Sequence, residues 1–162
     1  MIWIFVIVGA LLVSFCGVLL VGAPYLPTLS PQVIAALELA DLKPNQTLLE
    51  LGCGDGKVLI AAAKRGIKTI GYELNPVLAL IAWLRTRRYR SQTRIIWGNY
   101  WNKEWPPAEA IFVFLLPRYM SKLHNKCMQY RYPPIKLVSF AFNIPDKKAK
   151  SQKDGVFLYT YQ

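Results

Sequence analysis

The chain has 162 residues and a formal net charge of +11, from 20 Lys and Arg against nine Asp and Glu. Beyond an apolar N-terminal stretch, this length allows one compact domain and excludes a separate substrate domain. The three cysteines, Cys16, Cys53 and Cys127, indicate no disulfide framework and fit a reducing compartment.

The N-terminal segment is uncharged. Residues 1–23 contain no charged side chain, and the first basic residue is Lys43. As a helix, about 22 residues span about 33 Å, which exceeds the bilayer hydrocarbon core of about 30 Å. A cleaved signal peptide would need a basic segment before its apolar one. We therefore predict a single transmembrane helix over residues 1–23; a buried core helix is the alternative.

The distribution of charge predicts the membrane topology. All Lys and Arg residues follow the predicted transmembrane helix, so the positive-inside tendency places residues 24–162 on the cytoplasmic or mitochondrial-matrix side. A domain this basic is also attracted to anionic lipid headgroups. We expect a single-pass membrane protein, and the short chain favours a prokaryotic plasma membrane.

Residues 24–45 are predicted to form a linker and a short helix. Pro24 and Pro27 favour an extended backbone. Ser30 is expected to cap a helix that has Pro31 at its first position and ends near Asp41. The globular domain is expected over residues 46–162.

Strands and helices alternate along this domain. Strands are predicted at residues 47–51, 69–73, 95–97, 111–115, 137–142 and 156–161. Helices are predicted at residues 57–65, closed by Gly66, at 76–89, capped by Asn75, and from Pro117 onward. The basic stretch 147–153 is the one low-complexity segment, and no strand is predicted there. The alternation predicts an α/β fold with a doubly wound, mainly parallel sheet and an antiparallel C-terminal strand.

A glycine-rich loop follows the first predicted strand. Gly52, Gly54 and Gly56 alternate there, and Glu73 stands 19 residues beyond Gly54, at the end of the next strand. Glycines let a ligand approach the backbone, and a carboxylate at that spacing can accept both hydroxyls of a ribose. The spacing lacks the third glycine of the dinucleotide fingerprint, and no Gly-Lys-Ser/Thr follows, which excludes a P-loop. The pattern therefore predicts a site for a nucleoside-bearing cofactor.

This loop resembles motif I of class I S-adenosylmethionine-dependent methyltransferases, in which an acid and an apolar residue precede Gly-x-Gly-x-Gly. Three further blocks make the likeness narrower: Pro-Tyr-Leu-Pro-Thr at residues 24–28, Gly-Tyr-Glu-Leu-Asn-Pro at 71–76, and Phe-Leu-Leu-Pro-Arg-Tyr-Met at 114–120. Together they resemble the membrane-anchored protein-lysine methyltransferases that modify the adenine nucleotide translocase and the ATP synthase c-subunit, and their prokaryotic relatives. The resemblance implies a Rossmann-like fold and S-adenosyl-L-methionine as cofactor.

The resemblance also implies roles for individual residues. Glu50 and the three glycines would shape the pocket for the methionine part of the cofactor, and Glu73 would bind the ribose. Asn99 stands where such enzymes often have an acid that contacts adenine, and its amide oxygen can still accept that hydrogen bond. The implied cofactor-binding residues are Glu50, Gly52, Cys53, Gly54, Gly56, Glu73, Leu74, Asn99, Tyr25 and Thr28.

We place the acceptor pocket at Leu115, Leu116 and Pro117, with Tyr119 as a wall. The cofactor supplies the electrophile, so the protein has mainly to orient the two reactants. A lysine acceptor must lose its proton before attack, and an apolar pocket lowers its pKa from about 10.4. No catalytic base and no metal site are assigned. The expected activity is N-methylation of lysine in a membrane-associated protein.

Three alternatives remain open at this point. A lipid or small amine could be the methyl acceptor. A nucleic-acid substrate is disfavoured, because the Asp/Asn-Pro-Pro-Tyr/Phe block that grips a planar amino group is replaced here by Leu-Leu-Pro-Arg. The arginines at 85, 87, 88, 90 and 94 could hold nucleic acid, although anionic lipid is the favoured partner. A non-catalytic S-adenosylmethionine-binding membrane protein is the third possibility. The sequence does not indicate an oligomeric state.

Overall fold

The computed structural model describes residues 2–6, 9 and 26–162. Apart from residues 2–6 and 9, which are helical, the predicted transmembrane helix over 1–23 lies outside the described residues. Within the described ranges, no helix combines the length and the apolar composition needed to cross a bilayer.

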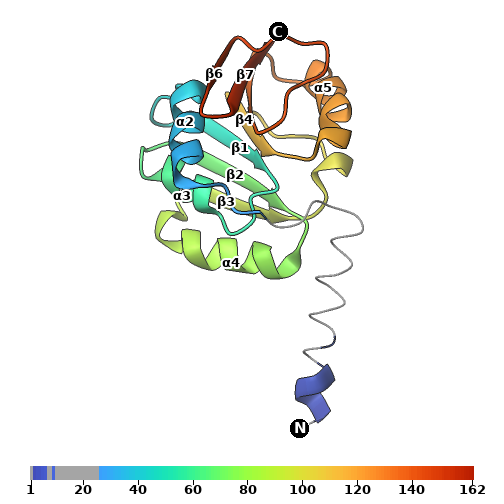
Figure 1. The fold of residues 1–162 in the computed structure, drawn as a ribbon. Helices are drawn as coiled ribbons and strands as arrows, with labels where there is room; N and C mark the ends of the chain where they lie inside the picture. The colour runs from blue at the N-terminus through green and yellow to red at the C-terminus, as the bar shows by residue number, and fades with distance from the viewer. Residues whose placement is uncertain (1, 7–8, 10–25) are drawn as a thin grey trace.

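The described residues form a seven-stranded sheet with the order β3-β2-β1-β4-β5-β7-β6 (Figure 1). Strands β1 to β5 run parallel, and β7 lies antiparallel between β5 and β6. This arrangement confirms the predicted mainly parallel, Rossmann-like α/β fold with an antiparallel C-terminal strand. The strands are β1 Thr47–Leu51, β2 Lys68–Glu73, β3 Thr93–Trp97, β4 Ala110–Phe114, β5 Ile135–Phe140, β6 Ser151–Lys153 and β7 Val156–Tyr161.

Helices cover both faces of the sheet. The helices α2 Ser30–Ala40, α3 Lys57–Ala63 and α4 Pro76–Thr86 lie on one face, where Leu48, Phe112 and Val138 of the strands are buried. The helix α5 Met120–Met128 lies on the other face, together with the chain segments that follow β3 and β5. The carboxyl ends of the parallel strands therefore form one edge between these two layers, which is where ligands bind in such sheets.

One helix-terminus prediction is confirmed and four are corrected. The helix α4 ends at Thr86 and not at residue 89, and α5 begins at Met120, after a 3₁₀ turn at Pro117–Tyr119. Ser30 is the first residue of α2 and not its cap; Leu29 precedes it and makes no side-chain capping bond. The helix α3 ends at Ala63, two residues earlier than predicted, because the chain turns there toward the left-handed Gly66 (φ +77°). Asn75 caps α4 as predicted, since its side chain accepts hydrogen bonds from the N–H groups of the second and third helical residues.

A short irregular connection joins β3 to β4. These strands are separated in the sheet by β2 and β1, and residues 98–109 cross between them with only the 3₁₀ turn Tyr100–Asn102. Trp105 is buried in this connection and donates its indole N–H to the carbonyl of Tyr100 at 3.0 Å. The Tyr130 hydroxyl donates to the carbonyl of Pro106 at 2.8 Å and accepts the N–H of Ala108 at 2.8 Å. The connection is therefore held firmly against the sheet without a helix.

Candidate functional site

The glycine loop after β1 is fixed to the end of β2. The backbone N–H groups of Gly52 and Cys53 both donate to the carbonyl of Tyr72, at 2.9 and 2.8 Å. Gly52, Gly54 and Gly56 have φ of +86°, +53° and +78°, in the left-handed region that favours glycine. The loop thus turns sharply outside the carboxyl end of the sheet and leads into α3.

The glycines in this region differ in what surrounds them. A Cβ on Gly52 would meet no atom within 4 Å, so the space beside it is open to a ligand. A Cβ on Gly56 would lie 3.2 Å from Thr86 Cγ2, so Gly56 lets α3 pack closely on α4. Gly71 in β2 belongs to the Gly-Tyr-Glu-Leu-Asn-Pro block, for which no packing role was predicted, but a Cβ there would lie 2.6 Å from Leu59 Cδ1 and 2.8 Å from Cys53 Sγ. Gly71 therefore makes room for the loop itself.

Glu73 lies at the end of β2 and faces this loop. Its Oε2 accepts the N–H of Gly54 at 2.8 Å, and its Oε1 accepts the N–H of Asn75 at 2.8 Å. The side chain is only 7% exposed. The sequence predicted that Glu73 and the glycine loop would meet at the sheet edge, and the structure brings them into direct contact. The two backbone donors hold the carboxylate in one orientation beside the open space at Gly52.

Glu50 is a buried acid beneath the loop. Its Oε2 has no hydrogen-bond partner among the described residues. Burial raises the pKa of Glu50 well above its usual value, the nearby Glu73 raises it further, and the backbone of Leu59 acts in the opposite direction. A buried oxygen without a partner is costly, and a cationic group placed near it would stabilise it. The ammonium group of the methionine part of S-adenosylmethionine fits this position.

Cys53 and Leu74 complete the loop region. Cys53 is buried, and burial, followed by the charges of Glu50 and Glu73, raises the pKa of its thiol well above its usual value. The carbonyl of Leu74 accepts the indole N–H of Trp97 at 3.1 Å. Trp97 pairs in register with Glu73, and its side chain is 67% exposed. An exposed aromatic ring therefore lies next to the predicted ribose carboxylate.

The remaining predicted cofactor residues come from two separate segments. Asn99 caps the 3₁₀ turn Tyr100–Asn102, because its Oδ1 accepts the N–H of Trp101 at 2.9 Å; its contact with adenine stays a prediction. Thr28 is buried, and its carbonyl accepts the Lys57 ammonium at 2.9 Å, which ties the linker to the first turn of α3. Tyr25 lies outside the described residues.

The predicted acceptor pocket lies at the end of the neighbouring strand β4. Strands β1 and β4 are paired, so the glycine loop and residues 115–119 leave the sheet side by side. Leu115 is buried and Leu116 and Tyr119 are half-buried, whereas Pro117 is exposed. Three of the four predicted pocket residues thus contribute to a sheltered apolar edge.

An aromatic cluster adjoins this pocket, and of its three members only Tyr119 was predicted from the sequence to belong to the site. The ring centroids of Tyr100 and Trp101 are 4.8 Å apart, and those of Trp101 and Tyr119 are 6.1 Å apart. Burial raises the pKa of Tyr100, and the proximity of Tyr119 and Glu73 raises it further. The Tyr100 hydroxyl therefore stays neutral between the cofactor loop and the acceptor pocket. The signal in the sequence was the aromatic pair directly after Asn99.

Basic residues of α5 hold this cluster in place. The Lys122 ammonium lies 4.5 Å from the centroid of the Trp101 ring. The Lys126 ammonium donates to the carbonyls of Trp101 and Lys103 at 3.2 and 3.0 Å. Burial and the neighbouring Lys122 lower the pKa of Lys126. On the same helix, His124 Nδ1 lies 3.0 Å from the Tyr161 hydroxyl, which gives the single histidine a structural partner.

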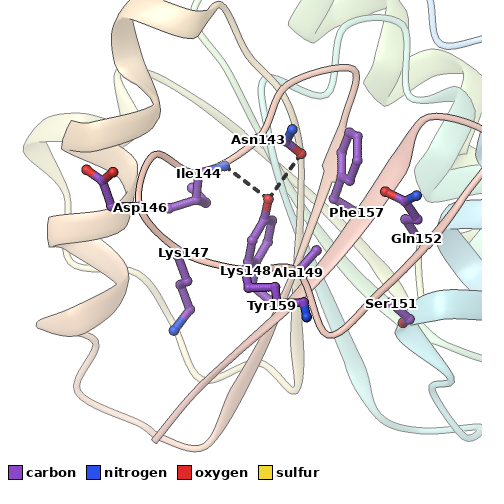
Figure 2. A pocket seen from close by; sticks show the side chains of 10 residues that line it. All are labelled: Asn143, Ile144, Asp146, Lys147, Lys148, Ala149, Ser151, Gln152, Phe157 and Tyr159. Carbon is purple, nitrogen blue, oxygen red and sulfur yellow. Dashed lines mark hydrogen bonds between the residues drawn. The ribbon is translucent and has the colours of Figure 1, made fainter.

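A hollow lies away from the glycine loop. It has a volume of about 550 Å³ and is lined by residues of the segment after β5 and by β6 and β7 (Figure 2). Figure 2 shows the Tyr159 hydroxyl between Asn143 and Ile144; it accepts the N–H of Ile144 at 3.1 Å. Lys147 and Lys148 give this hollow a basic rim. None of the predicted cofactor or acceptor residues lines it.

Comparison with known proteins places the chain among methyltransferases. Residues 50–151 match the family model described as the ANTKMT methyltransferase domain. The chain is 28% identical over 125 residues to the ATP synthase c-subunit lysine N-methyltransferase of Xenopus laevis, covering 76% of this chain and 55% of that protein. It is 30% identical over 125 residues to a protein-lysine N-methyltransferase of Saccharolobus islandicus, covering 75% of this chain and 78% of that protein. The chain thus spans about half the length of the Xenopus relative.

Among solved structures, an RNA methyltransferase from Salinibacter ruber in complex with S-adenosyl-L-homocysteine is similar. Its TM-score is 0.77 at 27% identity, covering 83% of this chain and 93% of that one. Less similar structures, such as a methyltransferase from Geobacter sulfurreducens at 16% identity and a TM-score of 0.61, share the fold. The family match and the likeness to the Salinibacter ruber structure agree with the geometry in identifying S-adenosylmethionine as the cofactor that the site fits.

Proposed function

Because this chain belongs to the family of ANTKMT methyltransferase domains, we propose that it transfers a methyl group from S-adenosylmethionine to a lysine of a membrane-associated protein. The observation that carries the proposal is the contact between Glu73 and the glycine loop, directly beside an apolar edge at Leu115. One side of the site suits a nucleoside and an amino acid, and the other suits an aliphatic chain.

The proposed cofactor site combines two acidic side chains with an open space beside a glycine. Glu73 would accept the ribose hydroxyls, and the open space at Gly52 would admit the methionine part above Glu50. When bound, the cofactor supplies a methyl group on a positively charged sulfur. Because Gly54 and Asn75 already orient the Glu73 carboxylate, little rearrangement is needed on binding.

The proposed acceptor site favours loss of the proton from the lysine ammonium, because its surroundings are apolar. A lysine that enters between Leu115 and Tyr119 leaves water for apolar and aromatic surroundings, which lowers its pKa and favours the neutral amine. The Tyr100 hydroxyl is held neutral by burial, so it cannot serve as an anionic base. It can donate a hydrogen bond to the amine nitrogen or accept one from an amine N–H. The residues of the chain thus desolvate and orient the amine.

A membrane-associated substrate is supported by two observations. The curated relative from Xenopus laevis is named for a component of the ATP synthase, and the segment 1–23 of this chain is uncharged and long enough to span a bilayer. Confinement of an enzyme and its substrate to one membrane raises their effective concentration. We propose that the catalytic domain lies on the cytoplasmic or matrix side of that membrane, because the basic residues follow the uncharged segment.

The proposal is tested with S-adenosylmethionine labelled in its methyl group. The full chain is incubated with membranes from a strain that lacks the gene, and the label is followed into protein, lipid and nucleic-acid fractions. We expect label in protein, recovered as methyl-lysine after hydrolysis and absent with Glu73→Ala. Label in lipid would indicate an amine-bearing lipid instead, and binding of cofactor without transfer to any fraction would indicate a non-catalytic protein.

A nucleic-acid substrate is the second candidate, because the similar Salinibacter ruber structure is of an RNA methyltransferase. Exposed arginines at 87, 88 and 90 would suit a phosphate backbone. Leu115 and Leu116, however, replace the polar residues that would grip a planar amino group. Incorporation of label into RNA, with salt-sensitive retention of the chain on RNA, would favour this candidate over lysine.

A further inference from the structure

The helix α4 is apolar on the face that points away from the domain. Its Ala79, Ala82 and Thr86 are buried against the sheet and α3. Its outer surface carries four large apolar residues: Leu80 (56% exposed), Ile81 (37%), Trp83 (59%) and Leu84 (45%). Figure 1 shows α4 along the margin of the domain, with the sheet on one side of it. A helix that is apolar on all sides is normally covered on all sides.

Cations continue this surface at the carboxyl end of the helix. Arg87, Arg88 and Arg90 are exposed, and none of them forms an ion pair with any described residue. Arg85 differs, because it pairs with Asp55 of the glycine loop. Residues 76–94 contain no acidic side chain at all. The outer face of α4 thus joins an apolar patch to a cluster of free positive charge.

We propose that this α4 face, formed by Leu80, Ile81, Trp83, Leu84, Arg87, Arg88 and Arg90, lies on the surface of an anionic lipid bilayer. Apolar side chains that insert at the acyl boundary, flanked by arginines among the headgroups, are the pattern of helices that lie in a membrane interface. Tryptophan prefers that depth, and each basic residue near the surface adds attraction to anionic lipid. A protein partner would require a complementary acidic and apolar surface.

The linker places more apolar surface near the same helices. Leu26 and Leu29 are 58% and 61% exposed on the segment that immediately follows the predicted transmembrane helix. Between them, Thr28 is tied to Lys57 in the first turn of α3, and Gly56 at the start of that turn packs on α4. The linker and α4 therefore flank the same end of α3, which is consistent with one membrane-facing side.

This orientation has a consequence for the site. The helix α4 begins directly after Asn75, so its amino end is at the cofactor edge of the sheet. Its 11 residues span about 16 Å. A helix lying flat on the headgroups would therefore keep the cofactor edge close to the membrane, where a lysine of an embedded protein can reach it. This inference rests on the proposed membrane association but not on methyl transfer.

Accessibility of engineered thiols tests the proposal in the full chain. In a parent carrying Cys16→Ala, the remaining Cys53 and Cys127 are buried. Leu80→Cys reports on the α4 face, and Met128→Cys, at a site 61% exposed on α5, is the matched control. Each variant is labelled with a membrane-impermeant maleimide in vesicles of phosphatidylcholine, with or without phosphatidylglycerol. We expect Leu80→Cys to react about tenfold more slowly in the anionic vesicles, and Met128→Cys to react equally in both.

Variants that remove charge test whether anionic lipid, and not another partner, covers the α4 face. Arg87→Gln with Arg88→Gln should restore fast labelling of Leu80→Cys, whereas Lys148→Gln with Lys150→Gln, the same change of charge elsewhere, should not. Equal labelling of Leu80→Cys in both vesicle types would overturn the proposal. Protection that develops without vesicles and grows with protein concentration would also overturn it, by showing that a second copy covers the helix. Because the assay measures no methyl transfer, these outcomes are independent of the catalytic proposal.

Discussion

The carboxylate of Glu73 accepts the backbone N–H of Gly54 at 2.8 Å, across 19 residues of chain. This bond joins the ends of two adjacent parallel strands and fixes the acid beside the open space at Gly52. It explains why the glycines and the acid must occur together: the left-handed Gly54 turns its N–H toward the carboxylate, and the carboxylate faces the space where a nucleoside would lie.

Removal of this carboxylate should weaken cofactor binding. Glu73→Ala loses the proposed ribose contacts and leaves two backbone N–H groups without their acceptor, and hydrogen bonds to charged groups contribute about 1.5–3 kcal/mol each. Titration calorimetry should show affinity for S-adenosylmethionine reduced at least tenfold, by about 1.4 kcal/mol or more. Glu104→Gln, which removes an exposed carboxylate paired with Arg131, is the control and should bind normally. Normal binding by Glu73→Ala would place the nucleoside elsewhere.

A methyl group at position 71 should destabilise the fold without touching the ligand. In Gly71→Ala, the new Cβ would meet Leu59 and Cys53 at less than 3 Å, and overpacking of this kind costs about 1–3 kcal/mol. Denaturant unfolding measures the loss. Leu59→Ala creates space at the same place, so the double variant should be more stable than the sum of the two single effects predicts. Strict additivity would show that the two groups do not meet.

Glu50 should make stability depend on pH. Because burial and Glu73 raise its pKa in the folded protein, the folded state binds the proton more tightly than the unfolded state does. The contribution of Glu50 is therefore most favourable below its ordinary pKa of 4.5, and it is lost as pH rises toward the raised value, by up to about 1.4 kcal/mol per pH unit. Glu50→Gln should flatten this part of the stability profile measured by denaturant unfolding. If Glu50→Gln had the same pH dependence of the free energy of unfolding as the unmodified chain, folding would not raise the pKa of Glu50.

Tyr119 should act on the acceptor and not on the cofactor. Tyr119→Ala removes a half-buried aromatic wall, and the lost apolar contact corresponds to about ten- to hundredfold in kcat/KM for a lysine substrate. Affinity for S-adenosylmethionine, measured separately, should stay the same. Tyr132→Ala, at an exposed tyrosine beyond α5, is the control. A loss of cofactor affinity in Tyr119→Ala would move this residue from the acceptor pocket to the cofactor pocket.

Two substitutions distinguish the possible roles of Asn99. Asn99→Asp keeps an acceptor for the N–H of Trp101, and it should increase cofactor affinity about tenfold if this side chain also contacts the adenine amino group. Asn99→Ala should cost about 1 kcal/mol of stability through loss of the cap. Unchanged affinity in both variants would restrict Asn99 to capping.

The cofactor loop could be predicted because its signals are local. The glycines at 52, 54 and 56, Asn75 before Pro76, and the uniformly apolar β4 each determine their own backbone, and the pairing of parallel strands then brings Glu73 to the loop. The C-terminal strand β7 lies at residues 156–161, as predicted, and it pairs antiparallel with β5.

Other features depend on contacts between distant residues. The strand β6 was missed because Ser151, Gln152 and Lys153 are polar and exposed, and only pairing with the apolar β7 makes them a strand. The role of Gly71 depends on Leu59 and Cys53, and the cluster of Tyr100, Trp101 and Tyr119 forms only when two separate segments meet. The sequence pattern of one segment does not indicate which distant residues will contact it.

The most direct test of the account is a crystal structure of the chain with S-adenosyl-L-homocysteine. We predict that both ribose hydroxyls lie within about 3.2 Å of the Glu73 carboxylate and that the amino-acid part extends past Gly52 toward Glu50. A nucleoside bound in the hollow beneath Tyr159, or anywhere away from Glu73, would contradict it.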